Sequence, residues 1–282
     1  MARAGVDHSR ASASITKTGR HMHPILVDAG PFTIYTYGFF IALGAVAGFS
    51  YMAWRGKREF GLTFDQSNNL FLLLVITGVV GGKLFMVFED PALYLGQPKK
   101  LLSGSGFVFY GSLLCCIPAM LWFFRRNQVP TLSMLDVMAV VTCLVHGFGR
   151  IGCFMAGCCY GLPTTRAFGV VFTNPTCQAD PLNTPLHPTQ LYEAGWIAVI
   201  LLTLLFLKGR KQFHGQLFLI YLMLYAGGRS VIEVFRGDLS RGFVVADVLS
   251  NSQFISLLVI GAAIYFYVKF GRKANLLAAN KK

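Results

Sequence analysis

The chain has 282 residues, of which 54% are hydrophobic and only 13% are charged, and its mean hydropathy is +0.56. Soluble globular domains carry close to a quarter charged residues, so this composition excludes that class and indicates a membrane protein. A helical crossing needs roughly 20 apolar residues plus a connector, so the length allows about six to eight crossings and no large soluble domain besides.

The first 21 residues differ from the rest of the chain. They contain no Leu, Phe or Trp and only one Ile, so they can form neither a membrane span nor the apolar centre of a signal peptide. The segment that opens at Met22 resembles a native amino terminus, and the residues before it are either a non-native extension or the product of a mis-assigned start. We therefore expect a disordered tail over 1–21, one membrane domain over 22–273 and a basic cytoplasmic tail over 274–282.

Hydropathy predicts an all-α membrane protein with seven spans. Pro130 and Pro188 stand just before predicted helices, where a missing amide proton costs little, and Pro118 predicts a kink in the third span. The predicted spans cover 33–54, 69–89, 106–124, 134–157, 189–207, 215–236 and 252–270.

The distribution of basic residues predicts the orientation of these spans. Lys and Arg gather in the first, third and fifth connectors and after the last span, which places these segments in the cytoplasm. An odd number of crossings then puts the N-terminus outside. The positive-inside distribution of basic residues thereby accounts for the net charge of +13, and we expect no nucleic-acid partner. Thirteen of the 25 Lys and Arg residues lie in these cytoplasmic segments: Arg55, Lys57, Arg58, Arg125, Arg126, Lys208, Arg210, Lys211, Lys269, Arg272, Lys273, Lys281 and Lys282.

Ionisable residues also occur inside or at the edges of the spans. Each costs roughly 2.5–3.5 kcal/mol in hydrocarbon on insertion scales, so each is expected to face protein or water and is a functional candidate. The predicted topology places them in the outer half of the membrane, together with two tyrosines. The set comprises Lys83, His146, Arg150, His187, Glu193, Arg229, Glu233 and Arg236, with Tyr37 and Tyr110.

Helical spacing brings several of these side chains onto shared faces. Tyr225, Arg229 and Glu233 follow one face of the sixth span, while His146 and Arg150 follow one face of the fourth. Two arginines from different helices that face a membrane cavity favour an anionic ligand. Guanidinium binds phosphate through paired hydrogen bonds and keeps its charge in a dry site, and the phosphates at this depth are lipid headgroups.

Purely structural ion pairing is the alternative interpretation of the same residues. Arg229 would then pair with Glu233 and Arg150 with Glu193, while Arg236 would extend to the interface. The gathering of the whole set in one leaflet favours a functional site over this alternative, because structural ion pairs have no reason to lie on one side.

Four sequence runs carry a resemblance to a known family: IYTYGFFIALG (34–44), HGFGRIGCFMAGCCYG (146–161), LHPTQLYEAG (186–195) and YAGGRSVIEVFRGD (225–238). Together they resemble the prolipoprotein diacylglyceryl transferases of bacterial inner membranes, over essentially all of residues 22–272. The resemblance implies seven transmembrane helices with the N-terminus outside. It also implies transfer of the diacylglyceryl group of phosphatidylglycerol to the lipobox cysteine thiol of a prolipoprotein signal peptide, which forms a thioether and releases glycerol phosphate.

The resemblance also implies roles for individual residues. Arg150 and Arg229 match the two signature arginines and are expected to bind the phosphate of phosphatidylglycerol and to assist catalysis. Glu233 and His187 complete the expected catalytic set with Tyr110. Further expected substrate-binding residues are Tyr37, Tyr225, Gly161, Arg236 and Glu193. No cofactor and no metal are expected.

The chain departs from the family pattern at three positions, where a histidine, an asparagine and an acid are replaced by Tyr110, Cys153 and Cys158 respectively. The first replacement concerns the mechanism, because a phenol with a pKa of about 10 is a poor base at neutral pH. We expect Tyr110 to position lipid or thiol by hydrogen bonding. His187, a carboxylate or the arginine-rich field would then lower the pKa of the substrate thiol.

Four cysteines, Cys153, Cys158, Cys159 and Cys177, are predicted at the outer face, where a disulfide, a thiol relay or a metal site is conceivable. Their spacing matches no standard zinc pattern, and vicinal cysteines bridge each other only with strain. The pattern favours packing of small side chains, or one disulfide to Cys177, over catalysis.

Two other classes of membrane protein remain as alternatives to a transferase. A lipid or anion transporter would also need arginines in the membrane, but it should show polar residues through the full depth, and the inner halves here are almost uncharged. A seven-helix sensor would account for the topology, yet it leaves the HPTQLYE run and the paired arginines unexplained.

Overall fold

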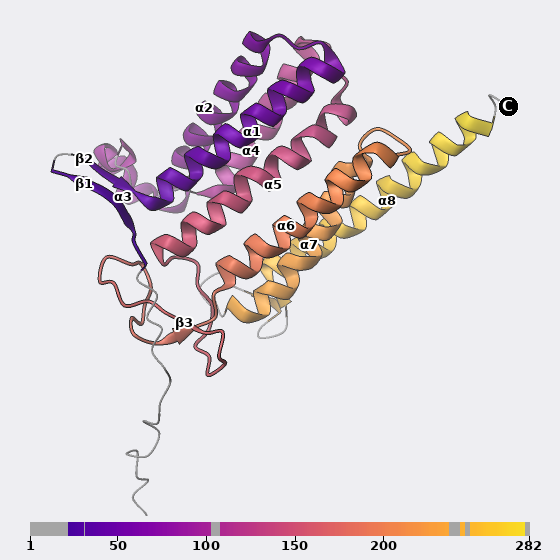
Figure 1. Cartoon of the computed structure of the whole chain (residues 1–282). Helices are drawn as coiled ribbons and strands as arrows, with labels where there is room; N and C mark the ends of the chain where they lie inside the picture. Colours follow the sequence, from indigo (N-terminus) through magenta and orange to yellow (C-terminus); the bar gives the residue numbers. More distant parts are fainter. Residues whose placement is uncertain (1–21, 31, 103–107, 237–242, 246–248, 280–282) are drawn as a thin grey trace, which may run out of the picture.

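A computed structural model describes residues 22–30, 32–102, 108–236, 243–245 and 249–279 of the chain, and helices run side by side through this part as a bundle (Figure 1). Short elements join the long helices: α3 (Pro91–Gly96), η2 (Pro98–Leu102) and η3 (Lys208–Arg210), with the strand pairs β1 (Ile25–Ala29) and β2 (Phe32–Tyr35), β3 (Val170–Val171) and β4 (Pro185–Leu186), and β5 (Phe243–Val245) and β6 (Leu249–Ser250). The long helices are α1 (Thr36–Phe60), α2 (Phe64–Glu89), α4 (Phe109–Arg126), α5 (Thr131–Ala156), α6 (Thr189–Leu207), α7 (Gln216–Arg236) and α8 (Asn251–Ala279).

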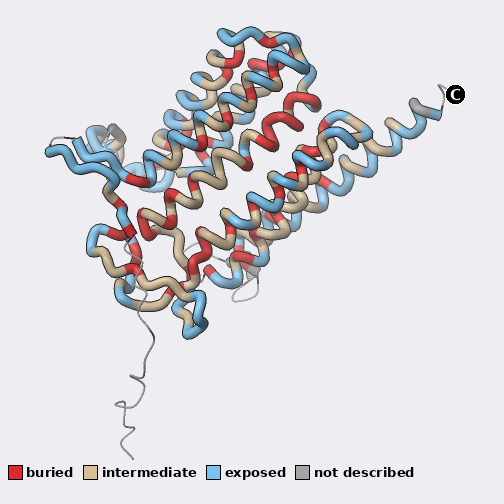
Figure 2. Tube along the Cα trace, in the orientation of Figure 1, coloured by how far each residue is buried: buried red, intermediate tan, exposed pale blue. Residues whose placement is uncertain are grey.

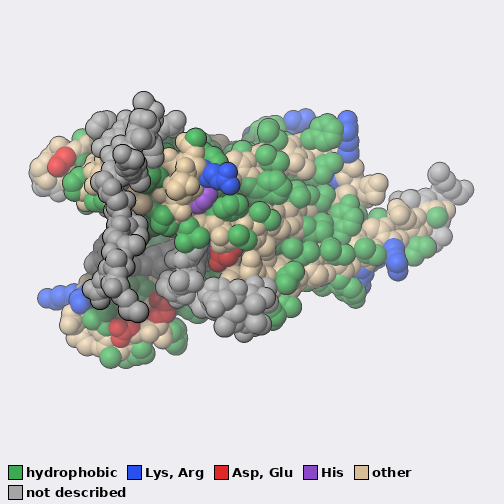
Figure 3. All heavy atoms as spheres, turned by 90° about the horizontal axis from the view of Figure 1, so that it is seen from below, with side chains coloured by type: hydrophobic (Ala, Val, Ile, Leu, Met, Phe, Trp, Pro, Cys, Tyr) green, Lys and Arg blue, Asp and Glu red, His purple; other side chains and the backbone are tan. Residues whose placement is uncertain are grey.

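Six of the described helices, α1, α2, α5, α6, α7 and α8, are long and apolar enough to cross a membrane. The helix at the third predicted span, α4, has 18 residues with Pro118 inside it and is not among the six. Hydrophobic side chains cover much of the helical surface in Figure 3, as contact with lipid tails requires. The prediction of a helical membrane protein is therefore confirmed.

The ends of the predicted spans need two corrections. The first span was predicted to begin at residue 33, but residues 33–35 belong to β2, which pairs with β1, and α1 begins at Thr36. The third was predicted to begin at residue 106, which lies outside the described residues, and α4 begins at Phe109. Alternating and helical patterns cannot be told apart over such short apolar stretches.

The central helix of the bundle is α5, which packs along α1 and α6 and also contacts α7. Half of its most apolar stretch (50%) is buried, against 11% for α8, and buried residues follow its length in Figure 2. Gly44 allows the close approach of α1, because a Cβ at this position would lie 3.0 Å from the Cβ of Phe148. Gly48 faces Val145 and Val141 in the same way, so this glycine pair lets α1 pack closely on α5.

A buried carboxylate fixes the start of α7 to α5. Asp136 accepts hydrogen bonds from the backbone N–H groups of Gly215 and Phe218 at 3.0 and 3.1 Å, and its Oδ2 lies 3.1 Å from Nζ of Lys211. These N–H groups have no acceptor within the helix, so Asp136 satisfies them and places a negative charge at the positive end of the helix dipole.

A close approach of two backbones joins α2 to α4. A Cβ at Gly111 would lie 2.5 Å from the carbonyl oxygen of Gly81, and a Cβ at Gly81 would lie equally close to the carbonyl oxygen of Gly111. Gly78, one turn earlier on α2, also faces α4, because a Cβ there would lie 3.4 Å from Sγ of Cys116.

We expect Gly111→Ala to lower the free energy of unfolding by about 1–3 kcal/mol, because the added methyl forces α2 and α4 apart. Thermal unfolding in detergent would measure the loss. Gly195→Ala is the matched control, since a Cβ there meets nothing within 4 Å. If Gly111→Ala unfolds at the same temperature as the control, the proposed constraint between α2 and α4 is wrong.

Candidate functional site

The end of the bundle at which α5 and α7 finish and α6 begins, here called the loop-rich end, carries the segment 157–188 (Figure 1). Gly157 ends α5 with a left-handed backbone, at φ 74°. Several hydrogen bonds tie the segment to the start of α6, among them those from Gly161 N to the His187 carbonyl at 2.8 Å and from Thr189 Oγ1 to the Cys159 carbonyl at 2.8 Å. The first turn of α6 is thereby held beside the last turns of α5.

Glu193 of α6 is the centre of a polar cluster inside this end. Its side chain is 2% exposed, and its Oε2 lies 3.0 Å from Nε of Arg150 on α5. Its Oε1 lies 3.3 Å from Nε2 of His146 and accepts a hydrogen bond from the Tyr225 hydroxyl of α7 at 3.1 Å. One buried carboxylate therefore joins three helices, which compensates a charge that would cost several kcal/mol alone.

Arg150 meets Glu193 through its inner nitrogen. The Nε atom also lies 3.2 Å from Nε2 of His146, one helical turn earlier. Within the described part of the chain, no hydrogen bond or ion pair occupies the two terminal Nη groups of Arg150. Those groups form the edge of guanidinium that binds a phosphate or carboxylate in a bidentate manner, so Arg150 is held in place and keeps its anion-binding edge.

A second ion pair lies on α7, where Arg229 and Glu233 pair across one turn. Arg229 is 8% exposed and lies within electrostatic range of Glu193, so the two arginines from α5 and α7 converge on one region. Arg236, the last residue of α7, is also buried. Both ion pairs of the structural alternative are therefore present, and they bring together the arginines that the sequence singled out.

Gly161 and Tyr37 lie at close contacts around this cluster. A Cβ at Gly161 would lie 2.3 Å from the carbonyl oxygen of Phe235 and 2.7 Å from Cγ2 of Thr189. Only glycine therefore fits between the end of α7 and the start of α6. Tyr37, in the first turn of α1, packs against Gly152 of α5, two residues beyond Arg150.

His187 and Tyr110 contact groups other than Arg150 and Arg229 in the described part of the chain. The Nδ1 atom of His187 is 3.1 Å from the Tyr192 hydroxyl, and its ring packs against Phe168 and Phe235. Tyr110 stands in the first turn of α4, which packs on α2, and its side chain is 57% exposed. None of the contacts recorded for these two residues in the described chain reaches Arg150, Glu193 or Arg229.

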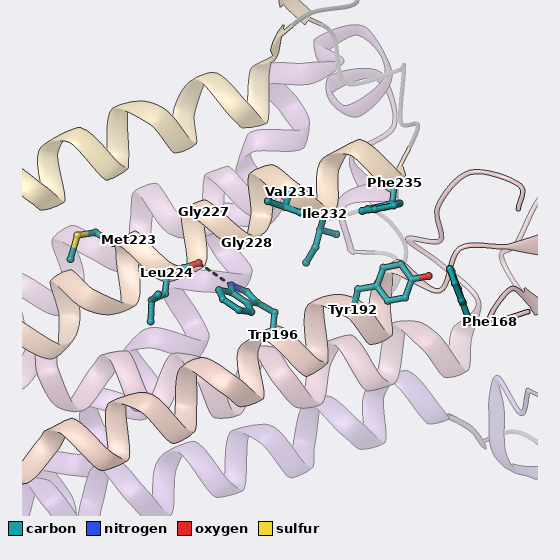
Figure 4. Close-up of a pocket in the computed structure, with 10 residues that line it drawn as sticks. All are labelled: Phe168, Tyr192, Trp196, Met223, Leu224, Gly227, Gly228, Val231, Ile232 and Phe235. Carbon is teal, nitrogen blue, oxygen red and sulfur yellow. Dashed lines mark hydrogen bonds between the residues drawn. The ribbon is translucent and has the colours of Figure 1, made fainter. Parts of the chain in front are cut away.

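An apolar pocket of about 760 Å³ opens between α6 and α7 (Figure 4). Its floor depends on Gly228, where a Cβ would lie 1.9 Å from Nε1 of Trp196, and that nitrogen donates a hydrogen bond to the carbonyl of Leu224 at 2.9 Å. Neither Trp196 nor Gly228 was predicted from the sequence as part of a site, although the paired glycines in YAGGRS are a signal for close approach. The lining residues are Phe168, Tyr192, Trp196, Met223, Leu224, Gly227, Gly228, Val231, Ile232 and Phe235.

A polar pocket of about 500 Å³ lies on the other side of the end of α7. Its lining includes Cys158, Cys159, Gly161, Asp180 and Arg236. Phe235 lines the apolar pocket and Arg236 lines the polar one, so adjacent residues of α7 face environments of opposite polarity. An amphipathic ligand matches such a pair of pockets, because its charged part and its hydrocarbon part need different surroundings.

The cysteines at this end are thiols, as are all seven in the chain. The disulfide considered for Cys177 is absent, and Cys177 instead packs with Phe154 and Phe172 in an apolar cluster. Hydrogen bonds from the thiols of Cys153 and Cys158 lower the pKa of the Cys159 thiol below its ordinary value, and the charges of Arg236 and Arg150 act in the same direction.

Comparison with known proteins identifies relatives over most of the chain. The sequence model of the family described as prolipoprotein diacylglyceryl transferase matches residues 24–269. A phosphatidylglycerol–prolipoprotein diacylglyceryl transferase of Clostridium tetani is 37% identical over 247 residues, covering 87% of this chain and 97% of the relative. Similar proteins of that name come from Clostridium perfringens, at 32% identity over 87% of this chain and 94% of the relative, and Dehalococcoides mccartyi, at 30% over 90% and 95%.

We expect Glu193→Gln to lower the free energy of unfolding by about 3–5 kcal/mol, because it removes the carboxylate that compensates the buried charge of Arg150. Tyr225→Phe should cost only about 1 kcal/mol, since it removes one hydrogen bond. Thermal unfolding in detergent would measure both. Glu89→Gln, at the exposed end of α2, is the control and should be neutral. A Glu193→Gln protein as stable as this control would contradict the central role of the carboxylate.

Proposed function

The chain belongs to the prolipoprotein diacylglyceryl transferase family, and we propose that its buried arginines bind the phosphate of phosphatidylglycerol while the diacylglyceryl group passes to a prolipoprotein thiol. The protein is a transferase that acts in the first step of lipoprotein maturation. The observation that carries the site assignment is the convergence of Arg150 and Arg229 around Glu193, with the terminal groups of Arg150 unoccupied among the described residues.

The reaction requires stabilisation of the leaving group. The sulfur of the substrate cysteine forms a bond to the glycerol carbon, and the bond from that carbon to the phosphate oxygen breaks. The oxygen keeps the electron pair, so negative charge grows on the departing glycerol phosphate. Arg150 and Arg229 would hold that charge, and their positions are fixed before substrate arrives by Glu193 and Glu233. Such fixed donors stabilise the transition state without reorganisation.

Glu193 acts in this proposal as a positioning residue and not as a base. Its two oxygens are already engaged by Arg150, His146 and Tyr225, and protonation would break those contacts. Tyr225 thus supports Arg150 through Glu193, and His146 supports it both through Glu193 and by direct contact. The earlier expectation that Glu193 and Tyr225 bind substrate becomes the proposal that they orient the arginine that does.

The two pockets supply places for the two parts of the lipid. The apolar pocket between α6 and α7 would receive acyl chains, because its lining is almost wholly hydrocarbon and aromatic (Figure 4). The polar pocket beside Arg236 would receive the terminal glycerol of the headgroup, while the phosphate would stay with Arg150 and Arg229, which do not line that pocket. Gly161 and Phe235 lie between the two pockets. A side chain larger than hydrogen at Gly161 would therefore displace the end of α7 that separates them.

His187 is the proposed acceptor of the thiol proton. Its ring lies among Phe168, Tyr192 and Phe235 of the apolar pocket, while its backbone N–H bonds to Leu162 of the polar pocket, so it lies where the two pockets meet. Histidine is also the side chain that most often serves as a general base. Tyr110, exposed on α4, would instead orient the incoming lipid or peptide.

The membrane arrangement is part of the same proposal. We place the protein in a bacterial inner membrane, with α4 as a seventh crossing. The N-terminus then lies outside and the C-terminus in the cytoplasm, and residues 22–273 form the catalytic domain. Packing supports the start of that domain, because Met22 is buried and its carbonyl accepts a hydrogen bond from Asn174. Arg125 and Arg126 close α4 on the same side as Lys57 and Arg58 close α1, which supports the crossing.

The deciding experiment incubates the purified protein with phosphatidylglycerol vesicles and a lipobox peptide, and follows the thioether product by mass spectrometry. We expect Arg150→Ala to reduce the rate by about 100-fold or more, because one fixed donor to the developing charge is lost. Arg150→Lys should recover only part of the rate, since lysine cannot bind in a bidentate manner.

Arg126→Ala, exposed at the far end of the bundle, is the control and should retain the parent rate. Thermal unfolding of each variant separates a loss of chemistry from a loss of fold. An absence of product from the parent protein would refute transfer under these conditions, and full activity in a folded Arg150→Ala protein would refute the role of Arg150.

Substitutions of His187 and Tyr110 should differ in how strongly they lower the reaction rate. We expect His187→Gln to lower the rate about 100-fold or more, in the range for loss of a general base. Tyr110→Phe should lower it by about tenfold or less, the cost of one hydrogen bond. If Tyr110→Phe is the more damaging variant and Tyr110→His restores the rate, the proton passes through position 110 and the assignment to His187 is wrong.

A further inference from the structure

Three thiols meet at the loop-rich end, just beyond the last turn of α5. Cys153 lies on α5, and the chain then turns back through Gly157 and Cys159, whose φ angles of 74° and 59° are both left-handed. This reversal returns Cys158 and Cys159 to the end of the helix, where the Cys158 N–H bonds to the Cys153 carbonyl at 3.1 Å. The three Sγ atoms all lie within 4.8 Å of one another.

From this geometry we propose that Cys153, Cys158 and Cys159 bind a thiophilic d¹⁰ metal ion of the Zn²⁺, Cd²⁺ or Cu⁺ type. A metal–sulfur bond of about 2.3 Å in a tetrahedral site places its sulfurs about 3.8 Å apart. The observed cluster needs only small side-chain rotations to reach that spacing. Ligands made of thiolate alone select soft metal ions over Mg²⁺ or Ca²⁺, which require oxygen.

Access and charge both suit this site. All three cysteines are half-buried, and two of them, Cys158 and Cys159, line the polar pocket, so an ion has a route in and a fourth position open to water. Three thiolates around a divalent ion carry one net negative charge. Arg150 lies within electrostatic range of Cys153, and Arg236 within range of Cys159, so positive charge is present to offset it.

This arrangement of cysteines could not be predicted from their spacing in the sequence. The spacing of Cys153, Cys158 and Cys159 differs from standard zinc patterns, which led to the expectation of no metal, and only the left-handed turn at Cys159 brings the vicinal thiols onto the helix end. The fourth cysteine of the region, Cys177, does not join the cluster. It packs against Gly157 from the apolar side, with Phe172 as its neighbour.

The test titrates Cd²⁺ into the reduced full-length protein, purified without oxygen in detergent, and follows thiolate-to-cadmium charge-transfer absorbance in the ultraviolet. We expect saturation at one Cd²⁺ per chain, release of the ion by excess Zn²⁺, and at least a tenfold weaker affinity in Cys153→Ser and in Cys158→Ser. Equilibrium dialysis with elemental analysis would measure the stoichiometry independently of absorbance and of transferase activity.

Two other cysteines provide matched controls, Cys177→Ser near the cluster and Cys116→Ser on α4, and both should bind Cd²⁺ like the parent. Absence of the charge-transfer band in the parent would overturn the proposal. So would an equal loss of affinity in Cys177→Ser, or a disulfide within the cluster of the reduced protein, seen as a mass lower by two hydrogen atoms.

Discussion

The interaction on which the site depends is the contact of one buried carboxylate, Glu193, with Arg150, His146 and Tyr225. An uncompensated charge inside a bundle that is surrounded by lipid costs several kcal/mol, so neither Glu193 nor Arg150 is tolerated without the other. This requirement fixes the depth of α6 against α5 and, through Tyr225, the rotation of α7. The hydrophobic effect does not set these positions, because lipid tails are as apolar as the helix surfaces that they cover.

The same contact explains how a structural ion pair and the proposed phosphate site can coexist. Glu193 engages the inner nitrogen of Arg150, which holds the side chain while the outer edge of the guanidinium keeps its donors. Arg229 is held on α7 by Glu233, which engages one of its terminal nitrogens, Nη1. A phosphate that enters between them meets donors that are already ordered, so binding does not have to overcome the rotamer entropy of two long side chains.

The loop-rich end combines opposite environments within a few residues. Gly161 allows the segment that follows α5 to contact the end of α7, where Phe235 faces the apolar pocket and Arg236 the polar one. The thiols of Cys153, Cys158 and Cys159 lie on the polar side, beside the arginines. A metal ion held there would share its electrostatic surroundings with the lipid phosphate, which links the two proposals physically although their tests are independent.

The sequence by itself determined the class of protein, the approximate spans and the identity of the buried charges, because hydropathy and the cost of ionisable residues in lipid act locally. It also paired Arg229 with Glu233, which follows from helical spacing. Only the tertiary structure decided that His146 and Tyr225 join Glu193, that Gly81 meets Gly111 of α4, and that three cysteines converge. These facts depend on how helices rotate against one another and on left-handed turns in the segment after α5, and neither is encoded in a repeating pattern of residue types.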